Sequence, residues 1–113
     1  MASQQQMMEL TTQLTDTMNQ VKITESTVYA LEVERRRQEL TLNELSSGDY
    51  TRLYKPVGRA YFLYSREELN SDISAALRKT ENEIVDCRAR LDSLFKKRDE
   101  QATQIQELVG SSR

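Results

Sequence analysis

The stretch YTRLYKPVGRAYFLY, residues 50–64, separates two long segments whose apolar residues repeat with helical spacing. It holds five of the chain's seven aromatic residues, and aromatic residues favour β-strands. Its central Pro56-Val57-Gly58 is typical of a turn. We therefore expect a strand at 51–55, a turn, and a second strand at 59–64, which form one β-hairpin within residues 50–64.

The second of these strands ends in Tyr61-Phe62-Leu63-Tyr64, which is apolar without alternation. A strand with one wet face alternates apolar and polar residues, so both faces of this strand should be covered. A lone hairpin is marginal in water, and the missing strands are expected from other chains. The hairpin could instead fold back on its own helices. The residues expected to form the assembly surface are Tyr50, Leu53, Tyr54, Val57, Gly58, Tyr61, Phe62, Leu63 and Tyr64.

The segment before the hairpin predicts a helix over about residues 5–47. Its start has capping-box spacing at Ser3 and Gln6, and Gly48 favours its end. Spacings of three and four residues alternate along a seam in which eight of twelve positions are apolar, which indicates a coiled coil. The seam positions are Met7, Leu10, Leu14, Thr17, Val21, Thr24, Val28, Leu31, Arg35, Gln38, Leu42 and Leu45.

The segment after the hairpin predicts a second helix over about residues 66–109. Ser65 and Glu68 have the spacing of a capping box, and Tyr64 and Leu69 that of a hydrophobic staple. Gly110 favours a helix end. Eight of the eleven seam positions are apolar. They are Ile73, Leu77, Thr80, Ile84, Cys87, Leu91, Leu94, Arg98, Gln101, Ile105 and Leu108.

One constant register joins the two seams when residues whose numbers add up to 115 are paired. It puts Leu42 opposite Ile73 at one end and Met7 opposite Leu108 at the other. Arg35 and Arg98 then face the threonines Thr80 and Thr17, past which a long cation can reach water. A parallel homodimer would instead put Arg35 against itself. We therefore predict a mainly α fold: a single domain over residues 1–113, built as an antiparallel two-helix coiled-coil hairpin with one β-hairpin at its bend.

Composition excludes several classes of function. A net charge of −2 argues against nucleic acid as the main ligand, and no apolar run approaches the length of a membrane span. The chain has no histidine, no metal-ligand cluster and no phosphate-binding glycine loop, so we expect no metal, no cofactor and no catalytic site. Met1–Gln4 lacks the features of a signal peptide, and the single Cys87 on the seam fits a reducing, intracellular location.

The outer ends of the two helices carry apolar residues suited to binding many shapes. All four methionines lie within the first 18 residues, and methionine side chains are flexible and polarizable. Met8, Met18 and Phe95 lie off the seam. The alternative is that most of these residues are ordinary seam positions. The expected contact residues, called the tip residues below, are Met7, Met8, Leu10, Leu14, Met18, Phe95, Ile105, Leu108 and Val109.

The motif Leu53-Tyr54-Lys55-Pro56-Val57-Gly58-Arg59-Ala60-Tyr61-Phe62-Leu63, set between two coiled-coil helices, resembles that of a β-type prefoldin subunit. The helical architecture that is similar covers nearly the whole chain, while the motif covers about fifteen residues. Pro56 departs from the motif and, because it lacks an N–H, should confine its flank to an edge or a turn. The α-type subunits carry two hairpins, and the 18 residues of Gly48–Ser65 hold one.

The resemblance implies a cytoplasmic, ATP-independent co-chaperone. Two α-type and four β-type prefoldin subunits would form a hetero-hexamer, in which the hairpins join into intersubunit β-barrels. The coiled-coil tips would capture unfolded clients of the actin and tubulin class and deliver them to the cytosolic group II chaperonin. The main rival hypothesis is a structural tether that docks one folded partner through the aromatic bend. An enzyme is the least favoured reading, because the sequence offers no site for catalysis.

Overall fold

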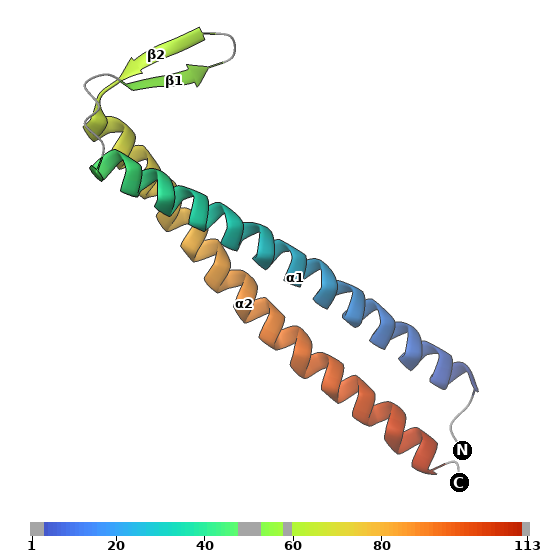
Figure 1. The fold of residues 1–113 in the computed structure, drawn as a ribbon. Coiled ribbons are helices and arrows are strands. Elements are labelled where there is room, and N and C mark those ends of the chain that lie inside the picture. Colours follow the sequence, from blue (N-terminus) through green and yellow to red (C-terminus); the bar gives the residue numbers. More distant parts are fainter. Residues whose placement is uncertain (1–3, 48–52, 58–59, 112–113) are drawn as a thin grey trace. The chain divides into compact units, whose positions relative to one another are not determined.

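The computed structural model describes residues 4–47, 53–57 and 60–111. Helix α1 covers Gln4–Ser47, strand β1 Leu53–Val57, strand β2 Ala60–Tyr64 and helix α2 Arg66–Ser111 (Figure 1). No helix in these described ranges is apolar enough to cross a membrane. The chain divides into two compact units. Unit 1 contains residues 1–29 and 85–113, and unit 2 contains residues 30–84.

Unit 1 pairs the first half of α1 with the last half of α2. Its apolar core residues are Val21 and Leu94. Thr17 is the most buried side chain in this unit, with 1 % of its surface exposed, and Thr24 and Gln101 are buried as well. All five are predicted seam positions, so the structure confirms the heptad phase in this unit. A coiled-coil seam here accepts polar residues within its core.

The buried threonines satisfy their hydroxyl groups within their own helix. The Oγ1 atoms of Thr17 and Thr24 donate to the carbonyl oxygens of Gln13 and Gln20, at 3.0 and 2.8 Å. Because each hydroxyl has an acceptor one turn earlier, its burial costs far less than that of an unpaired polar group. Gln101 differs, since its Oε1 atom is buried without a hydrogen-bond partner among the described residues.

Unit 2 contains the second half of α1, both strands and the first half of α2. Its buried residues are Leu45, Thr80 and Ile84, which are also predicted seam positions. The hydroxyl of Thr80 is satisfied in the same way as those of Thr17 and Thr24, because its Oγ1 donates to the carbonyl oxygen of Ala76 at 3.0 Å. Throughout the two helices, every predicted seam position is buried or half-buried.

Arg35 shows how a cation is tolerated on the seam of unit 2. Its side chain keeps 38 % of its surface exposed, and its Nη2 lies 2.7 Å from Oε2 of Glu32. A second carboxylate, that of Glu39, lies 3.8 Å from the Arg35 Nε. The guanidinium therefore reaches water and two carboxylates while its stem lies along the seam.

Ser65 caps the N-terminus of α2, as its sequence spacing predicts. The Glu68 N–H donates to Ser65 Oγ at 3.1 Å, and the Leu69 N–H donates to the Ser65 carbonyl oxygen at 3.0 Å. The first bond satisfies one of the N–H groups that a helix start leaves unpaired, and the second is the first regular hydrogen bond of the helix. This cap fixes where α2 begins, with Ser65 as the single residue between β2 and α2. The capping box at Ser3 and the staple position at Tyr64 lie outside the described residues and side chains.

Strands β1 and β2 pair in antiparallel fashion, and the register runs from Leu53 opposite Tyr64 to Val57 opposite Ala60. The predicted turn at Pro56-Val57-Gly58 is wrong in position, because Pro56 and Val57 belong to β1. Proline fixes φ near the extended region, so it fits a strand wherever the ladder does not need its missing N–H. Residues 50–52 and 58–59 of the predicted hairpin lie outside the described residues.

The predicted end of the second helix is also wrong, because α2 continues through Gly110 to Ser111. Glycine lowers helix propensity by about 1 kcal/mol but does not forbid the helical conformation. The Ser111 Oγ donates to the Leu108 carbonyl oxygen at 3.0 Å and so satisfies one carbonyl of the last turn. Glycine after an apolar run was therefore an insufficient stop signal.

Candidate functional site

The strand pair is the first candidate site. In the described part of the chain the sheet consists of β1 and β2, so each strand has one edge that the other does not pair. Such edges accept further strands through main-chain hydrogen bonds. The register puts Tyr54 opposite Leu63 on one face and Leu53 opposite Tyr64 on the other. Both faces therefore carry large apolar residue types, while the predicted members Tyr50 and Gly58 lie outside the described residues.

The tip residues form the second candidate site, and all nine lie in unit 1. Met8, Met18 and Val109 are exposed, with 65 %, 45 % and 41 % of their surface accessible. Met8 lies in a shallow depression of α1 with Gln5 and Thr12. The other six tip residues are half-buried: Met7, Leu10, Leu14, Phe95, Ile105 and Leu108.

Phe95 is partly covered by a cation. The guanidinium carbon of Arg98 lies 4.8 Å from the centre of the Phe95 ring, and Arg98 Nη2 lies 3.2 Å from Asp99 Oδ1. A cation over an aromatic face is attracted by the ring quadrupole. Phe95 therefore offers an apolar edge rather than a bare ring, and its role as a contact residue stays a prediction.

Five large apolar residues of the described helices are exposed and were not among the sequence predictions. They lie on the outward faces of the helices, away from the seam, and each exposes more than half of its surface. Seam spacing alone does not identify these residues, although their positions off the seam can be read from the sequence. These residues are Ile23, Tyr29, Val33, Leu40 and Val85.

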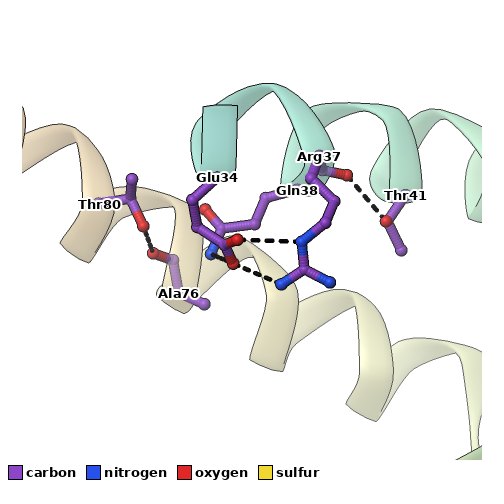
Figure 2. A network of polar contacts seen from close by, with 6 residues as sticks. All are labelled: Glu34, Arg37, Gln38, Thr41, Ala76 and Thr80. Carbon is purple, nitrogen blue, oxygen red and sulfur yellow. Dashed lines mark hydrogen bonds and ion pairs between the residues drawn. The ribbon is translucent and has the colours of Figure 1, made fainter. Parts of the chain in front are cut away.

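Unit 2 also contains a groove between α1 and α2, with a volume of about 330 Å³. From α1 it is lined by polar side chains and from α2 mainly by apolar ones. Figure 2 shows the polar network at this place, in which Arg37 approaches the Glu34 carboxylate from one side and Gln38 from the other. The lining residues are Glu34, Arg37, Gln38, Thr41, Leu69, Asp72, Ile73 and Ala76.

The ion pair in this groove has a defined geometry. Arg37 Nη2 and Nε donate to Glu34 Oε1 and Oε2 at 2.5 and 3.0 Å, which is a two-point contact. The hydrogen bonds from Arg37 hold the pKa of the Glu34 carboxyl below its usual range. Glu34 is therefore ionised at neutral pH. Groups of three or more metal-ligating side chains are absent from the described ranges, and in this network the Glu34 carboxylate is held by Arg37 and Gln38.

Three comparisons relate this architecture to known proteins. The family model described as "Prefoldin subunit" matches residues 4–112. The chain belongs to the prefoldin subunit family. It is 26 % identical to prefoldin subunit 1 of Tetraodon nigroviridis over 106 residues, which cover 93 % of this chain and 87 % of that protein.

A solved structure has the same fold. The crystal structure of the prefoldin beta subunit from Thermococcus strain KS-1 matches with a TM-score of 0.83 and 19 % identity, and covers 91 % of each chain. This likeness confirms the two-helix coiled-coil hairpin, and the family model confirms the resemblance that the sequence indicated. Membership of the prefoldin family supports a co-chaperone role, and the members of this family are chaperone subunits rather than enzymes.

Proposed function

We propose that this chain is a β-type subunit of a hetero-hexameric, ATP-independent prefoldin. It would capture unfolded polypeptides of the actin and tubulin class in the cytoplasm and deliver them to the cytosolic group II chaperonin. The observation that carries the proposal is the prefoldin match over residues 4–112, which includes both helices and both strands.

Assembly through the strand pair is the first part of the proposal. Two strands are too few for a sheet that is stable alone, and each strand leaves one edge open for a further strand. The register puts large apolar residue types on both faces, which favours a sheet covered on both sides. Further strands from neighbouring prefoldin subunits would close this sheet into an intersubunit β-barrel.

Client capture by the tip residues is the second part. Apolar surface is available without any rearrangement at the exposed residues Met8, Met18 and Val109. The half-buried tip residues would add to this surface if the outer helix ends separate. Each such contact is weak. Several tips acting on one unfolded chain bind through high effective concentration, which needs no nucleotide hydrolysis.

Two measurements test the proposal. Native mass spectrometry of the complex purified on the tagged chain should show six small subunits, and a homodimer or a single large partner would favour the tether hypothesis instead. Suppression of aggregation of a denatured client is then measured with the assembled complex. Removing residues 1–9 and 103–113, which deletes five of the nine tip residues, should lower the protection, and full protection by the truncated complex would refute the tip assignment.

The strand pair has its own test. Phe62→Asp should prevent incorporation into the hexamer, because an unpaired charge buried in a shared sheet costs several kcal/mol. The control variant Phe62→Leu keeps an apolar side chain and should assemble. The helical circular dichroism signal should survive in both variants, because the helices do not depend on the sheet.

A further inference from the structure

The first half of α1 consists largely of residues that form helices poorly. Residues 11–29, called the cover segment below, contain six threonines and only six strong helix formers, counted as Ala, Leu, Arg, Met, Lys, Gln and Glu. The predicted register puts residues 86–104 of α2, called the supporting segment, opposite the cover segment. The supporting segment has twelve strong helix formers and one threonine over the same length. Within unit 1, α1 therefore depends on its partner helix more than α2 does.

Each threonine of the cover segment directs its hydroxyl back to its own helix. The six Oγ1 atoms donate to the carbonyl oxygen four residues earlier, at 2.8–3.0 Å. Such bonds slightly destabilise a helix, and a branched Cβ loses rotamer freedom there. Four of these threonines are exposed off the seam, where they lower the helix propensity of α1 without adding to its core. They are Thr11, Thr12, Thr15 and Thr27.

The packing that holds the cover segment in place is only partly apolar. The buried apolar residues of unit 1 are Val21 and Leu94, whereas the buried Thr17, Thr24 and Gln101 are polar. Helices of low propensity take their stability from tertiary packing, so a weak helix is combined here with a weak seam. Local unfolding begins where stability is lowest. We therefore expect the cover segment to unfold locally before the supporting segment.

Unfolding of the cover segment would expose the seam face of α2. The seven residues 4–10 are too few to stay helical alone, so the whole first half of α1 would leave this face. The face carries apolar residues at helical spacing that are buried or half-buried while α1 covers them. An amphipathic segment binds such a face through anchors at the same spacing. These residues are Leu91, Leu94, Ile105 and Leu108.

We propose that the client displaces the cover segment, and that an apolar, amphipathic segment of the client binds the seam face of α2 in its place. Leu91 and Leu94, which are not among the tip residues, then become client contacts. The inference rests on the proposed function and deepens it, because it identifies the open form as the one that captures the client. Since α1 competes for the same face, the apparent affinity decreases with the fraction of chains that are open.

Hydrogen exchange of the assembled complex, followed by mass spectrometry of peptides from this chain, tests the displacement. In the empty complex the cover segment should exchange faster than the supporting segment. Saturation with guanidinium-unfolded actin should lower the protection of the cover segment by about ten-fold or more, because bound client keeps α1 open. The supporting segment should stay at least as protected as before. Unchanged or increased protection of the cover segment would show that the client binds the closed helix pair, and would overturn the inference.

Two pairs of substitutions test the competition. Thr15→Ala with Thr27→Ala changes two exposed residues of the cover segment and leaves every seam and tip residue in place. Each change favours the helix by up to about three-fold, so the pair should raise the protection of the cover segment about ten-fold. The actin concentration that half-saturates the loss of protection should rise by the same factor, because the open form is rarer.

Ser93→Ala with Thr103→Ala is the matched control. Both residues are exposed in the supporting segment, which stays helical in the open and the closed form, so the half-saturating concentration should change by less than about two-fold. An unchanged value for the Thr15 and Thr27 pair overturns the inference, as does an equal rise for both pairs. Native mass spectrometry of the same samples reports whether actin binds at all. A wild-type complex that binds no unfolded actin would refute the proposed function, and the inference with it.

Discussion

Gln101→Leu should stabilise the helix pair of unit 1. Gln101 exposes only 9 % of its surface on the seam, and its Oε1 has no partner among the described residues. A buried acceptor without a partner costs about 1–3 kcal/mol. Leucine has a similar reach and equal helix propensity, and the predicted register puts it opposite Leu14. We therefore expect the free energy of unfolding to rise by about 1–2 kcal/mol, the lower part of that range.

The assay is thermal unfolding followed by circular dichroism at 222 nm. A gain of 1–2 kcal/mol should raise Tm by about 4–10 °C for a chain of this size. The protein concentration must be the same for every variant, because association shifts Tm by mass action. Gln106→Leu is the matched control, since Gln106 is exposed on the same helix and its replacement removes no buried acceptor.

Two results would refute this reasoning. A Tm for Gln101→Leu no higher than that of Gln106→Leu would show that the acceptor is satisfied in solution, for instance by water. A lower Tm for Gln101→Leu would show that the amide stabilises the seam, so that the polar layer contributes to the fold. Urea unfolding with an unchanged m-value would establish that only stability had changed.

Three further predictions concern the helices. Ile84→Ala should cost about 2–4 kcal/mol because Ile84 is 3 % exposed, whereas Val85→Ala next to it, at 65 % exposed, should change the urea midpoint little. Ser65→Ala should lower the free energy of unfolding by about 1 kcal/mol through loss of the α2 cap, and an unchanged urea midpoint would contradict the capping role. Arg37→Gln should raise the pKa of the Glu34 carboxyl, measured by carbon-13 NMR titration. Because that pKa is lowered in the folded chain, ionised Glu34 stabilises the fold at any pH above its unfolded-state pKa. This stabilisation disappears as the pH falls through the pKa of the folded chain. The variant should therefore lose this part of the pH dependence of its free energy of unfolding.

The heptad pattern was sufficient to predict the helix pair. Regular spacing identified Val21, Leu94 and Ile84 as core residues, and the structure buries all three. It also assigned Thr17 to the seam although threonine is polar, and Thr17 is the most buried residue of unit 1. Spacing succeeds here because a long helix has one repeat, and that repeat alone determines which face is buried.

Local signals were less reliable wherever one residue allows two conformations. Proline suits both turns and strand edges, so Pro56 was assigned to a turn although it lies in β1. Glycine allows a helix end without requiring one, and α2 passes through Gly110. The assembly and tip residues, and the single domain over residues 1–113, stay predictions, since occupancy by a partner or a client is not encoded in the spacing of one chain.

The groove could not be predicted from the sequence for a different reason. Its lining combines residues of both helices, and each of these residues taken alone gives no sign of a groove. Gln38 Oε1 is buried without a hydrogen-bond partner among the described residues, and this too can be recognised only when the direction of the amide is known from its hydrogen bond to Glu34. A site that is lined by two helices becomes apparent only when the packing of those helices is known.

Gln38 and Gln101 have the same defect, an unpartnered buried Oε1 on a coiled-coil seam, in contrast to the threonines that bond their own helix. If both were simply imperfections of packing, leucine at either position would stabilise the chain and leave assembly unchanged. Gln38 also donates its Nε2 to Glu34 Oε1, and leucine at position 38 would remove this hydrogen bond, so leucine at position 38 should raise Tm less than leucine at position 101. An equal or larger rise at position 38 would show that the hydrogen bond to Glu34 contributes little to stability, because both variants remove one buried acceptor and only one of them also removes a bond.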